Sequence, residues 1–576
     1  MDNQRLFPWL ALAAMLFLNY EAWQKDFPPP SAVTAGQPAA PGTAAPPTPA
    51  ASSLDDLPSL PATPTKTSAS PGAAAPPAAG KTTDATDAAP AAGAMVHVRT
   101  DVLDLEIAAQ GAEIKSANLL AYTRKKDDPS DHVQLFADGT DGSNLSLFQW
   151  GLRTGGSDPE PNHKALFTPA ATDYTLKDGE SELVVPLTWT NGAGLTVTRT
   201  FTLTRASYAV ALDQHVDNAG TTAWAAHDYA RIVRHWAHVE TSFWNRDPEL
   251  TAFRGPVFSD GTKIQKLNVE KADADRPPKT PVTGGWAAAM QHYFVVAFVP
   301  DPKTPQVYEL GVQPERFSFT VVGPETSVAP GASADIKSTL YIGPKIQKSL
   351  EAIAPKLDRT TDFGYLTIIA QPLFKLLAFV QGIVGNWGVT IIIVTFLIKL
   401  CFYPLAQTSG RSMAKMRHLA PRMKTIQERY KDDREQLGKQ MMELYKREKV
   451  NPLAGCLPIV VQIPVFIAFY WVLLESVELR QAPFAFWIQD LSTRDQWFVL
   501  PIIMGIAMYG QFKLNPAPPD PVQAKVFAFM PLLMTGMMAF FPAGLVLYWI
   551  TNTTLSIAQQ WRINKLVEAG DKKPKA

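Results

Sequence analysis

Residues 376–398 spell LLAFVQGIVGNWGVTIIIVTFLI, a run of 23 residues without a charged side chain. A helix needs about 20 mostly apolar residues to cross the hydrocarbon core of a bilayer, so this stretch predicts a membrane protein. Glycines subdivide the run, and we place the predicted span at 387–403. For the preceding segment, 346–386, we predict a linker and an interfacial amphipathic helix, because Pro372 and Lys375 interrupt its apolar pattern.

Apolar segments further along the chain predict four more spans, at 457–474, 497–514, 522–541 and 544–562. The last two share an uncharged run of 36 residues, 526–561. As a single helix this run would extend about 54 Å, whereas the hydrocarbon core is about 30 Å thick. Pro542 and Gly544 lie near its middle, so we predict two spans joined by a tight turn.

In the N-terminal segment 1–27, the stretch from Leu6 to Trp23 is apolar apart from Asn19 and Glu21 near its end, and it follows a short, weakly basic start. The small-x-small site of a cleaved signal peptide does not follow it, so we favour an uncleaved anchor. This anchor brings the number of predicted spans to six. Residues 28–94 consist mostly of Pro, Ala, Thr, Ser and Gly, which bury too little apolar surface to offset the entropy cost of folding. They predict a disordered linker.

The loops assign an orientation, because cytoplasmic loops are enriched in Lys and Arg. Segment 404–456 carries 12 basic against six acidic side chains and predicts a cytoplasmic loop. Segment 475–496 has two basic against four acidic side chains and predicts a loop on the outer side of the membrane, whereas the tail 563–576 is basic again. Both termini are therefore predicted to be cytoplasmic, and the domain after the anchor to lie on the outer side.

The composition agrees with residence in a membrane. Only 18% of the 576 residues are charged, whereas soluble domains usually carry about 25%. The 53 basic side chains balance the 53 acidic ones, which argues against a DNA-binding protein.

Residues 95–345 show the period of two that is typical of β-strands. Leu195, Val197, Phe201 and Leu203 alternate with threonines, and the preceding Asn191-Gly192 is a strong hairpin signal. Further strand-like runs lie at 96–107, 183–189, 208–216 and 316–322. The segment predicts an all-β sandwich.

Histidines are the only candidate metal ligands in this β domain that we identify. His235 and His238 form an H-x-x-H pair near His227 and Asp228, a spacing that places two imidazoles together on a helix. A third ligand is not identifiable, and scattered surface histidines are commoner. We predict no metal and no cofactor, and since the common catalytic motifs do not occur, a binding or scaffolding module rather than an enzyme.

The predicted cytoplasmic loop has a helical apolar pattern. Its apolar side chains recur at near-heptad spacing, at Met413, Met416, Ala420 and Met423 and again at Leu437, Met441 and Leu444. This pattern predicts an antiparallel helical hairpin, in which Pro421 kinks the first helix or marks a fresh start. Two interpretations stay open: a solvated connector, or a mobile docking surface whose methionines adapt to varied apolar partners.

Lys399 lies four residues before Tyr403, at the cytoplasmic side of its predicted span. A lysine there is costly unless it reaches water, headgroups or a partner. One interpretation is that its long stem snorkels to the interface. The other is a water-filled recess in which Lys399 and Thr395, one helical turn earlier, face Gln462 and Asn552 from other spans. The five spans predicted from residue 387 onward contain no carboxylate to pair with it, which argues against a proton-coupled or cation-coupled carrier.

Five motifs stand out in the C-terminal part: QPLFKLL at 371–377, GNWG at 385–388, SMAKM at 412–416, NPLAGCLP at 451–458 and FPAGLVLY at 541–548. They closely resemble motifs of a known family, the YidC membrane protein insertases of Gram-negative bacteria. The resemblance covers about 357–561 at the level of motifs, whereas the anchor, linker and β domain match in order and type.

This resemblance implies a five-helix core with a hydrophilic groove that is open to the cytoplasm and to lipid and closed on the outer side. It also implies a periplasmic β-supersandwich. The basic groove residue of the family, usually arginine, falls on Lys399, and Thr395 matches another groove position. Lysine keeps the charge but lacks the planar fork of arginine. Trp549 stands beside Tyr548 where a tyrosine is common, so an aromatic contact is kept and a hydroxyl is lost.

The expected protein is therefore an α-helical polytopic membrane protein with six transmembrane helices, a large extracytoplasmic β-sandwich and a cytoplasmic helical hairpin. We expect it to insert and help fold nascent membrane proteins in the bacterial inner membrane, alone or with the Sec translocon, by a physical rather than a covalent mechanism. The basic tail is weak evidence for contact with the ribosome. An assembly scaffold without autonomous insertion and, less well supported, a solute transporter are the alternatives; a transporter usually shows inverted repeats, and we find none here.

Overall fold

A computed structural model describes residues 93–571, except 138, 140–144, 157–158, 237–251, 272–275, 431–432, 449–456 and 515–520. The predicted anchor 1–27, nearly all of the predicted linker 28–94, and the end of the tail lie outside the described residues. His238 of the histidine pair does so too.

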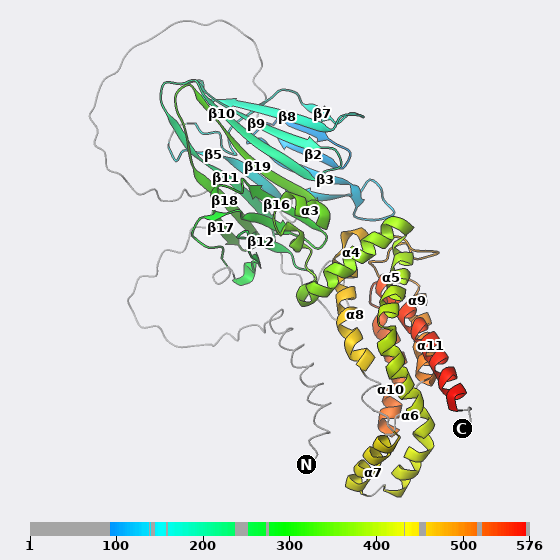
Figure 1. The fold of residues 1–576 in the computed structure, drawn as a ribbon. Coiled ribbons are helices and arrows are strands. Elements are labelled where there is room, and N and C mark those ends of the chain that lie inside the picture. The colour runs from blue at the N-terminus through cyan, green and yellow to red at the C-terminus, as the bar shows by residue number, and fades with distance from the viewer. Residues whose placement is uncertain are drawn as a thin grey trace, which may run out of the picture. The chain divides into compact units, whose positions relative to one another are not determined.

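The N-terminal part of the described chain forms two large sheets (Figure 1). The first sheet has ten strands. In spatial order these are β14 (Val282–Thr283), β17 (Pro305–Gln313), β18 (Arg316–Val328), β11 (Trp224–His235), β5 (Ser146–Arg153), β3 (Glu113–Thr123), β2 (Leu103–Ala108), β1 (Met95–Arg99) and β7 (Asp173–Thr175), with β4 (His132–Phe136) paired to β3.

The second sheet has nine strands. In spatial order they are β13 (Ile264–Lys266), β12 (Gly255–Ser259), β15 (Trp286–Met290), β16 (Phe294–Pro300), β19 (Ala332–Pro344), β10 (Ala209–Asn218), β9 (Leu195–Thr204), β8 (Glu182–Thr190) and β6 (Thr168–Pro169).

The two sheets share one apolar core, which makes the domain a β-sandwich. The ring centroids of Phe148 on β5 and Phe298 on β16 lie 5.8 Å apart, and those of Trp150 on β5 and Phe201 on β9 lie 5.3 Å apart. The prediction of a β-sandwich from the period-two pattern is confirmed.

The predicted hairpin joins β8 to β9 in antiparallel register. Asn191 closes its turn, since its Oδ1 accepts hydrogen bonds from the amides of Ala193 and Leu195, and Gly192 adopts a φ of 71°. The single strand predicted at 96–107 is wrong: the structure has β1 and β2, separated by a turn in which the Thr100 hydroxyl accepts from the amide of Leu103.

Arg199 occupies one of the inward positions of β9 and is fully buried. Its guanidinium donates hydrogen bonds to Gln214 Oε1 at 3.1 Å and to the backbone carbonyls of Gly111 and Pro161. It also lies over the rings of Trp150, 4.9 Å from the centroid, and Phe167, 4.3 Å away. Burial lowers the pKa of Arg199 to about 9, so the group stays charged at neutral pH.

The C-terminal part of the described chain is helical (Figure 1). Its helices are α3 (Gln347–Ile353), α4 (Thr367–Val384), α5 (Trp387–Cys401), α6 (Tyr403–Arg429), α7 (Arg434–Arg447), α8 (Leu457–Glu475), α9 (Val499–Leu514), α10 (Pro521–Met538) and α11 (Ala543–Asp571). Side chains from α4, α5, α8, α9 and α11 form a second apolar core.

Among the described residues, one helix is long and apolar enough to cross a membrane, Gly364–Val384. The pair Trp387–Cys401 and Tyr403–Met416 passes the same test only when counted together, with a bend of 65° between its halves. Shorter apolar helices lie at Val460–Glu475, Val499–Leu514 and Lys525–Met538. The segment that we assigned to the interface thus has the length of a span, and the number of spans stays a prediction.

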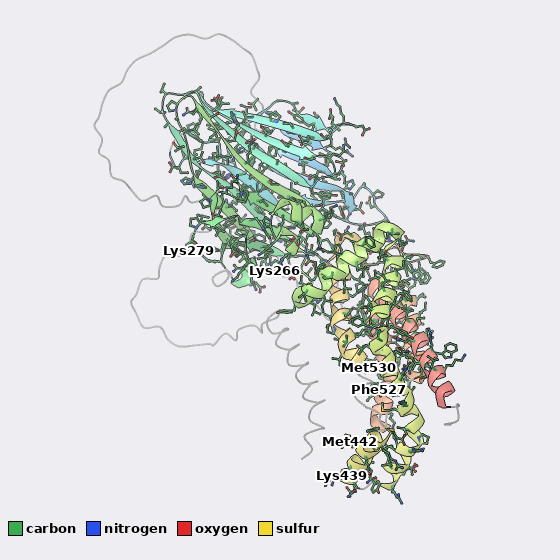
Figure 2. All side chains as sticks on the ribbon, in the orientation of Figure 1. Lys266, Lys279, Lys439, Met442, Phe527 and Met530 are labelled. Carbon is green, nitrogen blue, oxygen red and sulfur yellow. The ribbon has the colours of Figure 1, made fainter. Side chains whose placement is uncertain are left out.

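Exposed apolar side chains lie along several of these helices. On α4, Ile368 and Phe379 are 83% and 68% exposed. On α10, Phe527 is also exposed, and Figure 2 marks it near Met530. Such a surface suits contact with lipid rather than with water.

Helices α6 and α7 form the two arms of a hairpin and pack against each other through a small apolar cluster. The first arm continues through Pro421, so the fresh start that we considered there does not occur. Helix α11 begins directly after Pro542, where we predicted the break, but it extends to Asp571 and takes in most of the segment predicted as a tail, since residues 563–571 contain no proline and a single glycine, Gly570.

Asn386 fixes the start of α5. Its Oδ1 accepts from the amide of Val389 at 3.0 Å, and its Nδ2 donates to the carbonyl of Phe484 at 3.0 Å. We expect Asn386→Ala to destabilise this helix start by about 1 kcal/mol, measured as faster hydrogen exchange of the Val389 amide in the purified full-length protein. Asn386→Asp keeps the capping oxygen and should destabilise the helix start less. Unchanged exchange in the alanine variant would contradict the capping role.

Candidate functional site

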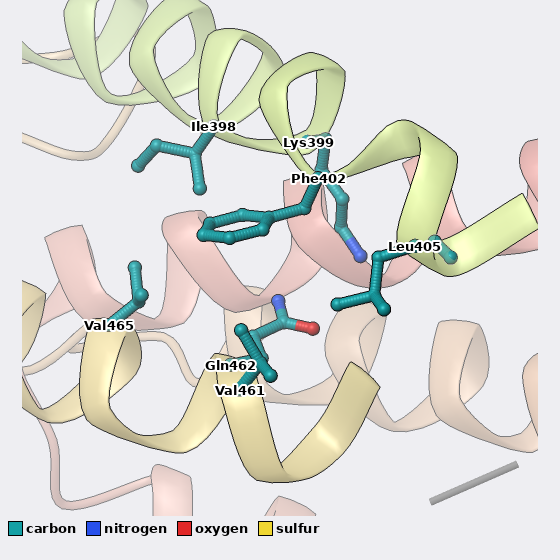
Figure 3. A pocket seen from close by; sticks show the side chains of 8 residues that line it. Ile398, Lys399, Phe402, Leu405, Val461, Gln462 and Val465 are labelled. Carbon is teal, nitrogen blue, oxygen red and sulfur yellow. The ribbon is translucent and has the colours of Figure 1, made fainter. Parts of the chain in front are cut away.

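A small pocket lies between α5, the start of α6 and α8, with a volume of about 40 Å³. It is lined by Ile398, Lys399, Phe402, Leu405, Ala406, Val461, Gln462 and Val465. Lys399 and Gln462 supply the polar groups, and Figure 3 shows their side chains pointing toward each other from opposite walls. A cavity needs about 10–15 Å³ by this measure to hold one water molecule, so the pocket has room for a few water-sized groups.

Lys399 is half-buried and is turned into the protein rather than left unpaired. Its Nζ donates a hydrogen bond to Ser556 Oγ on α11 at 2.7 Å. The neighbouring side chains of Phe396 and Leu400 are 51% and 57% exposed and apolar. A cation therefore lies beside an exposed apolar helix face.

Gln462 and Asn552, the two amides that we predicted to face Lys399, contact each other. Gln462 Nε2 on α8 donates to Asn552 Oδ1 on α11. Gln462 also lines the pocket, so the structure brings Lys399, Gln462 and Asn552 into one polar group between three helices.

Thr395 does not share this arrangement. It is 1% exposed, and its hydroxyl donates to the carbonyl of Ile391 on its own helix at 2.6 Å. Thr395 is not among the side chains that line the pocket, and its hydroxyl is satisfied on the carbonyl four residues earlier, as is common for a threonine inside a helix. Its role in substrate binding stays a prediction.

Tyr548, the last residue of the motif at 541–548, and the adjacent Trp549 both pack against α8. Tyr548 is buried and stacks on Phe469 with ring centroids 4.4 Å apart, and Trp549 meets Phe466 edge-on at 4.8 Å. The aromatic contact that we expected Trp549 to keep is present. Neither residue lines the pocket, so they act here as packing partners that hold α8 against α11.

In the hairpin, Met416, Met423 and Met441 belong to the cluster between its arms, together with Leu419 and Leu444. These methionines are occupied in packing. The side chain of Met413 lies outside the described residues. Met442 on α7, which we did not single out, is 42% exposed and lies near Lys439 in Figure 2.

Ser556 is the polar site residue that the sequence reasoning missed. It lies four residues after Asn552 and eight after Tyr548, on the same face of α11. Helical spacing could have identified it from either predicted site residue. Phe402, Leu405, Val461 and Val465 were missed because apolar pocket walls are indistinguishable from core positions in a sequence.

Known families account for nearly all of the described chain. Residues 95–376 match the YidC periplasmic domain, and residues 379–571 match the 60Kd inner membrane protein family. The membrane protein insertase YidC of Nitrosococcus oceani is 43% identical over 574 residues, covering 99% of both chains. The chain belongs to the YidC family of membrane protein insertases.

Other YidC proteins give the same result. The YidC insertase of Thioalkalivibrio sulfidiphilus is 42% identical over 590 residues, covering 100% of both chains. A solved structure of an active YidC insertase with its first transmembrane domain resolved covers 81% of this chain and 94% of that chain, at 17% identity and a TM-score of 0.36.

Family membership confirms the resemblance that the motifs indicated. The protein is a membrane protein insertase of the inner membrane with a YidC periplasmic β domain, and nascent membrane proteins are its substrates. The match to the periplasmic domain extends into α4, beyond the boundary at 345 that we predicted.

Proposed function

We propose that this YidC protein inserts its substrates along α5, and that Lys399 is the charge that attracts them. The observation that carries this proposal is the direction of the Lys399 side chain, whose Nζ is held by Ser556 inside the pocket. A snorkelling lysine would instead extend toward headgroups or bulk water.

The first step is electrostatic. A hydrophilic tail with a carboxylate approaches Lys399 and gains both charge attraction and hydrogen bonds, so that it avoids part of the cost of entering hydrocarbon unsatisfied. A pocket of about 40 Å³ is large enough for a small group such as a carboxylate, and we propose that α5 and α8 part to admit a longer segment. The amides of Gln462 and Asn552 would then exchange their mutual hydrogen bond for bonds to the substrate.

The second step is hydrophobic. Phe396 and Leu400 lie next to Lys399 and expose apolar surface, so the apolar segment of the substrate can move along them into lipid. Moving the apolar segment from water into lipid lowers the free energy by roughly 25 cal/mol for each Å² of apolar surface removed from water. The residues of the site thus need no cofactor for insertion.

For the topology we propose six spans, with both termini cytoplasmic and the β domain periplasmic. The loop 404–456 supports this orientation, because its excess of basic side chains is typical of the cytoplasmic side. We propose that α4 lies at the interface with its exposed face in lipid, that the anchor 1–27 forms the first span, and that α5, α8, α9, α10 and α11 form the other five.

The hairpin α6–α7 and the end of α11 would then meet substrates and partners in the cytoplasm. The exposed Met442 next to charged side chains gives the hairpin an adaptable surface for apolar segments. Contact of the basic tail with the ribosome, and cooperation with the Sec translocon on multi-span substrates, belong to the same proposal.

Reconstitution of the purified protein into liposomes tests autonomous insertion. A small single-span substrate with an acidic outer tail should become protease-protected in proteoliposomes and not in empty liposomes. Equal protection in both would contradict autonomous insertion and favour an assembly factor that depends on the translocon.

A further inference from the structure

Ser556 links the predicted groove charge to α11. Its Oγ accepts a hydrogen bond from Lys399 Nζ at 2.7 Å, and it donates its own proton to the carbonyl of Asn552 at 2.7 Å. A hydroxyl has one proton and two lone pairs. Because the proton is engaged by the backbone, a lone pair is left directed at the ammonium, and the direction of the bond is fixed.

The other polar groups near Lys399 are engaged elsewhere. Thr395, on the same helix, donates to Ile391, and Gln462 donates to Asn552. Among the described residues, Ser556 is the one side chain that hydrogen-bonds Lys399.

Most of the described side chains around Lys399 are apolar, namely Ile398, Phe402, Leu405 and Val465. The polar exception, Gln462, is hydrogen-bonded to Asn552, so an ammonium released from Ser556 would have to compete for this amide or turn to water or headgroups. A lysine ammonium is a point charge on a flexible stem with several rotatable bonds, which makes its position depend on the partner that holds it.

We infer that Ser556 is a positioning residue that keeps the Lys399 ammonium inside the pocket and presents its remaining N–H groups to the acidic tail of a substrate. This inference rests on the proposed function, in which Lys399 attracts the tail. Ser556 does not itself need to touch the substrate. It acts through Lys399, and its loss should matter only while the lysine is present.

A double-mutant cycle in proteoliposomes tests this dependence. Protease-protected insertion of the single-span substrate with an acidic tail is measured for wild type, Ser556→Ala, Lys399→Met and the double variant. We expect Ser556→Ala to lower insertion about fivefold, because a hydrogen bond to a charged group is lost. In the Lys399→Met background, Ser556→Ala should cause no further decrease in insertion. With Lys399 present, Ser556→Thr should keep most of the wild-type insertion, because threonine retains the hydroxyl.

Thr551→Val is the matched control. Thr551 also lies on α11, and its hydroxyl donates to the carbonyl of Leu547 at 2.9 Å, so the variant removes a hydroxyl bonded to its own helix away from Lys399. Its insertion should equal that of wild type, as should insertion by Ser556→Ala of a substrate whose tail carries amides in place of carboxylates.

The outcomes separate this inference from the proposed function. An equal loss from Ser556→Ala in both backgrounds would show a packing role and overturn the inference. A loss in Lys399→Met without any loss in Ser556→Ala would overturn the inference and leave the proposed function standing. If Lys399→Met inserts as well as wild type, the attraction by Lys399 is refuted and the inference falls with it.

Discussion

Replacing Lys399 with alanine should lower insertion of an acidic-tailed substrate about tenfold, whereas Lys399→Arg should keep most of it. Two unit charges 4 Å apart interact by roughly 4 kcal/mol near a protein surface, and desolvation cancels much of this gain. A net loss of about 1.4 kcal/mol corresponds to a factor of ten. The measurement is the protease-protected fraction of substrate in proteoliposomes that contain equal amounts of each variant.

The substrate provides the control for this prediction. When the carboxylates of its tail are replaced by amides, wild type and Lys399→Ala should insert it equally well, because the charge has no partner. Equal insertion of the acidic tail by Lys399→Ala and wild type would reduce Lys399 to a snorkelling residue. The insertase assignment would not be affected, since it rests on the match to YidC proteins over the whole chain.

Replacing Arg199 with methionine should destabilise the β domain by about 3–5 kcal/mol. Methionine fills much of the same space but leaves the carbonyl of Gly111 and the side chain of Gln214 without this donor inside the core, and leaves the carbonyl of Pro161 with the amide of Leu152 alone. Buried polar groups that lose a partner cost about 1–3 kcal/mol each, and some relaxation of the neighbouring chain reduces the sum. Hydrogen exchange of the β9 amides in the full-length protein measures this change as a lower free energy of opening.

Arg205→Met is the matched control for Arg199. Arg205 follows β9, and its guanidinium also donates to backbone carbonyls, those of Glu180 and Lys177, but at an exposed site. Water replaces the lost donor there, so the cost should stay below about 1 kcal/mol. Similar effects of the two substitutions would contradict the structural role of the buried guanidinium.

The helical part of the fold was predictable to within a few residues at most boundaries. The span predicted at 387–403 corresponds to α5 at Trp387–Cys401, and the segment predicted at 457–474 corresponds to α8 at Leu457–Glu475. Long uncharged runs and a proline between two helices are local features of the sequence, so they set the helix boundaries independently of how the helices pack. The end of α11 was not predictable from hydropathy, because a helix continues into polar sequence until a breaker stops it.

The strands were predictable in type and less so in number. Alternation placed β8, β9 and β10 correctly, since one face of each is buried. Alternation does not show a short turn inside a continuous pattern, which is why β1 and β2 were merged. The order of strands in the two sheets depends on pairings between distant residues, which the sequence alone does not reveal.

The candidate site was predicted in part. Lys399, Gln462 and Asn552 were identified as polar residues within apolar spans, where such side chains are costly and therefore stand out. Thr395 does not line the pocket, and Ser556 was overlooked. A hydroxyl inside a helix bonds to its own backbone as readily as to a neighbour, and only the packing of the neighbouring helix decides between the two.

By itself, the sequence determined the class of the molecule. Uncharged runs require a bilayer or an apolar core, and alternation requires a sheet with one buried face. The motifs at 371–377 and 541–548 resemble YidC. All three features can be recognised in the sequence because they depend on residues close together in the chain. Only the tertiary structure decided which polar groups meet. Lys399 and Ser556 are 157 positions apart, and Arg199 and Gly111 are 88 apart. Their contacts arise when helices and sheets pack, since burial then forces each polar group to find a partner.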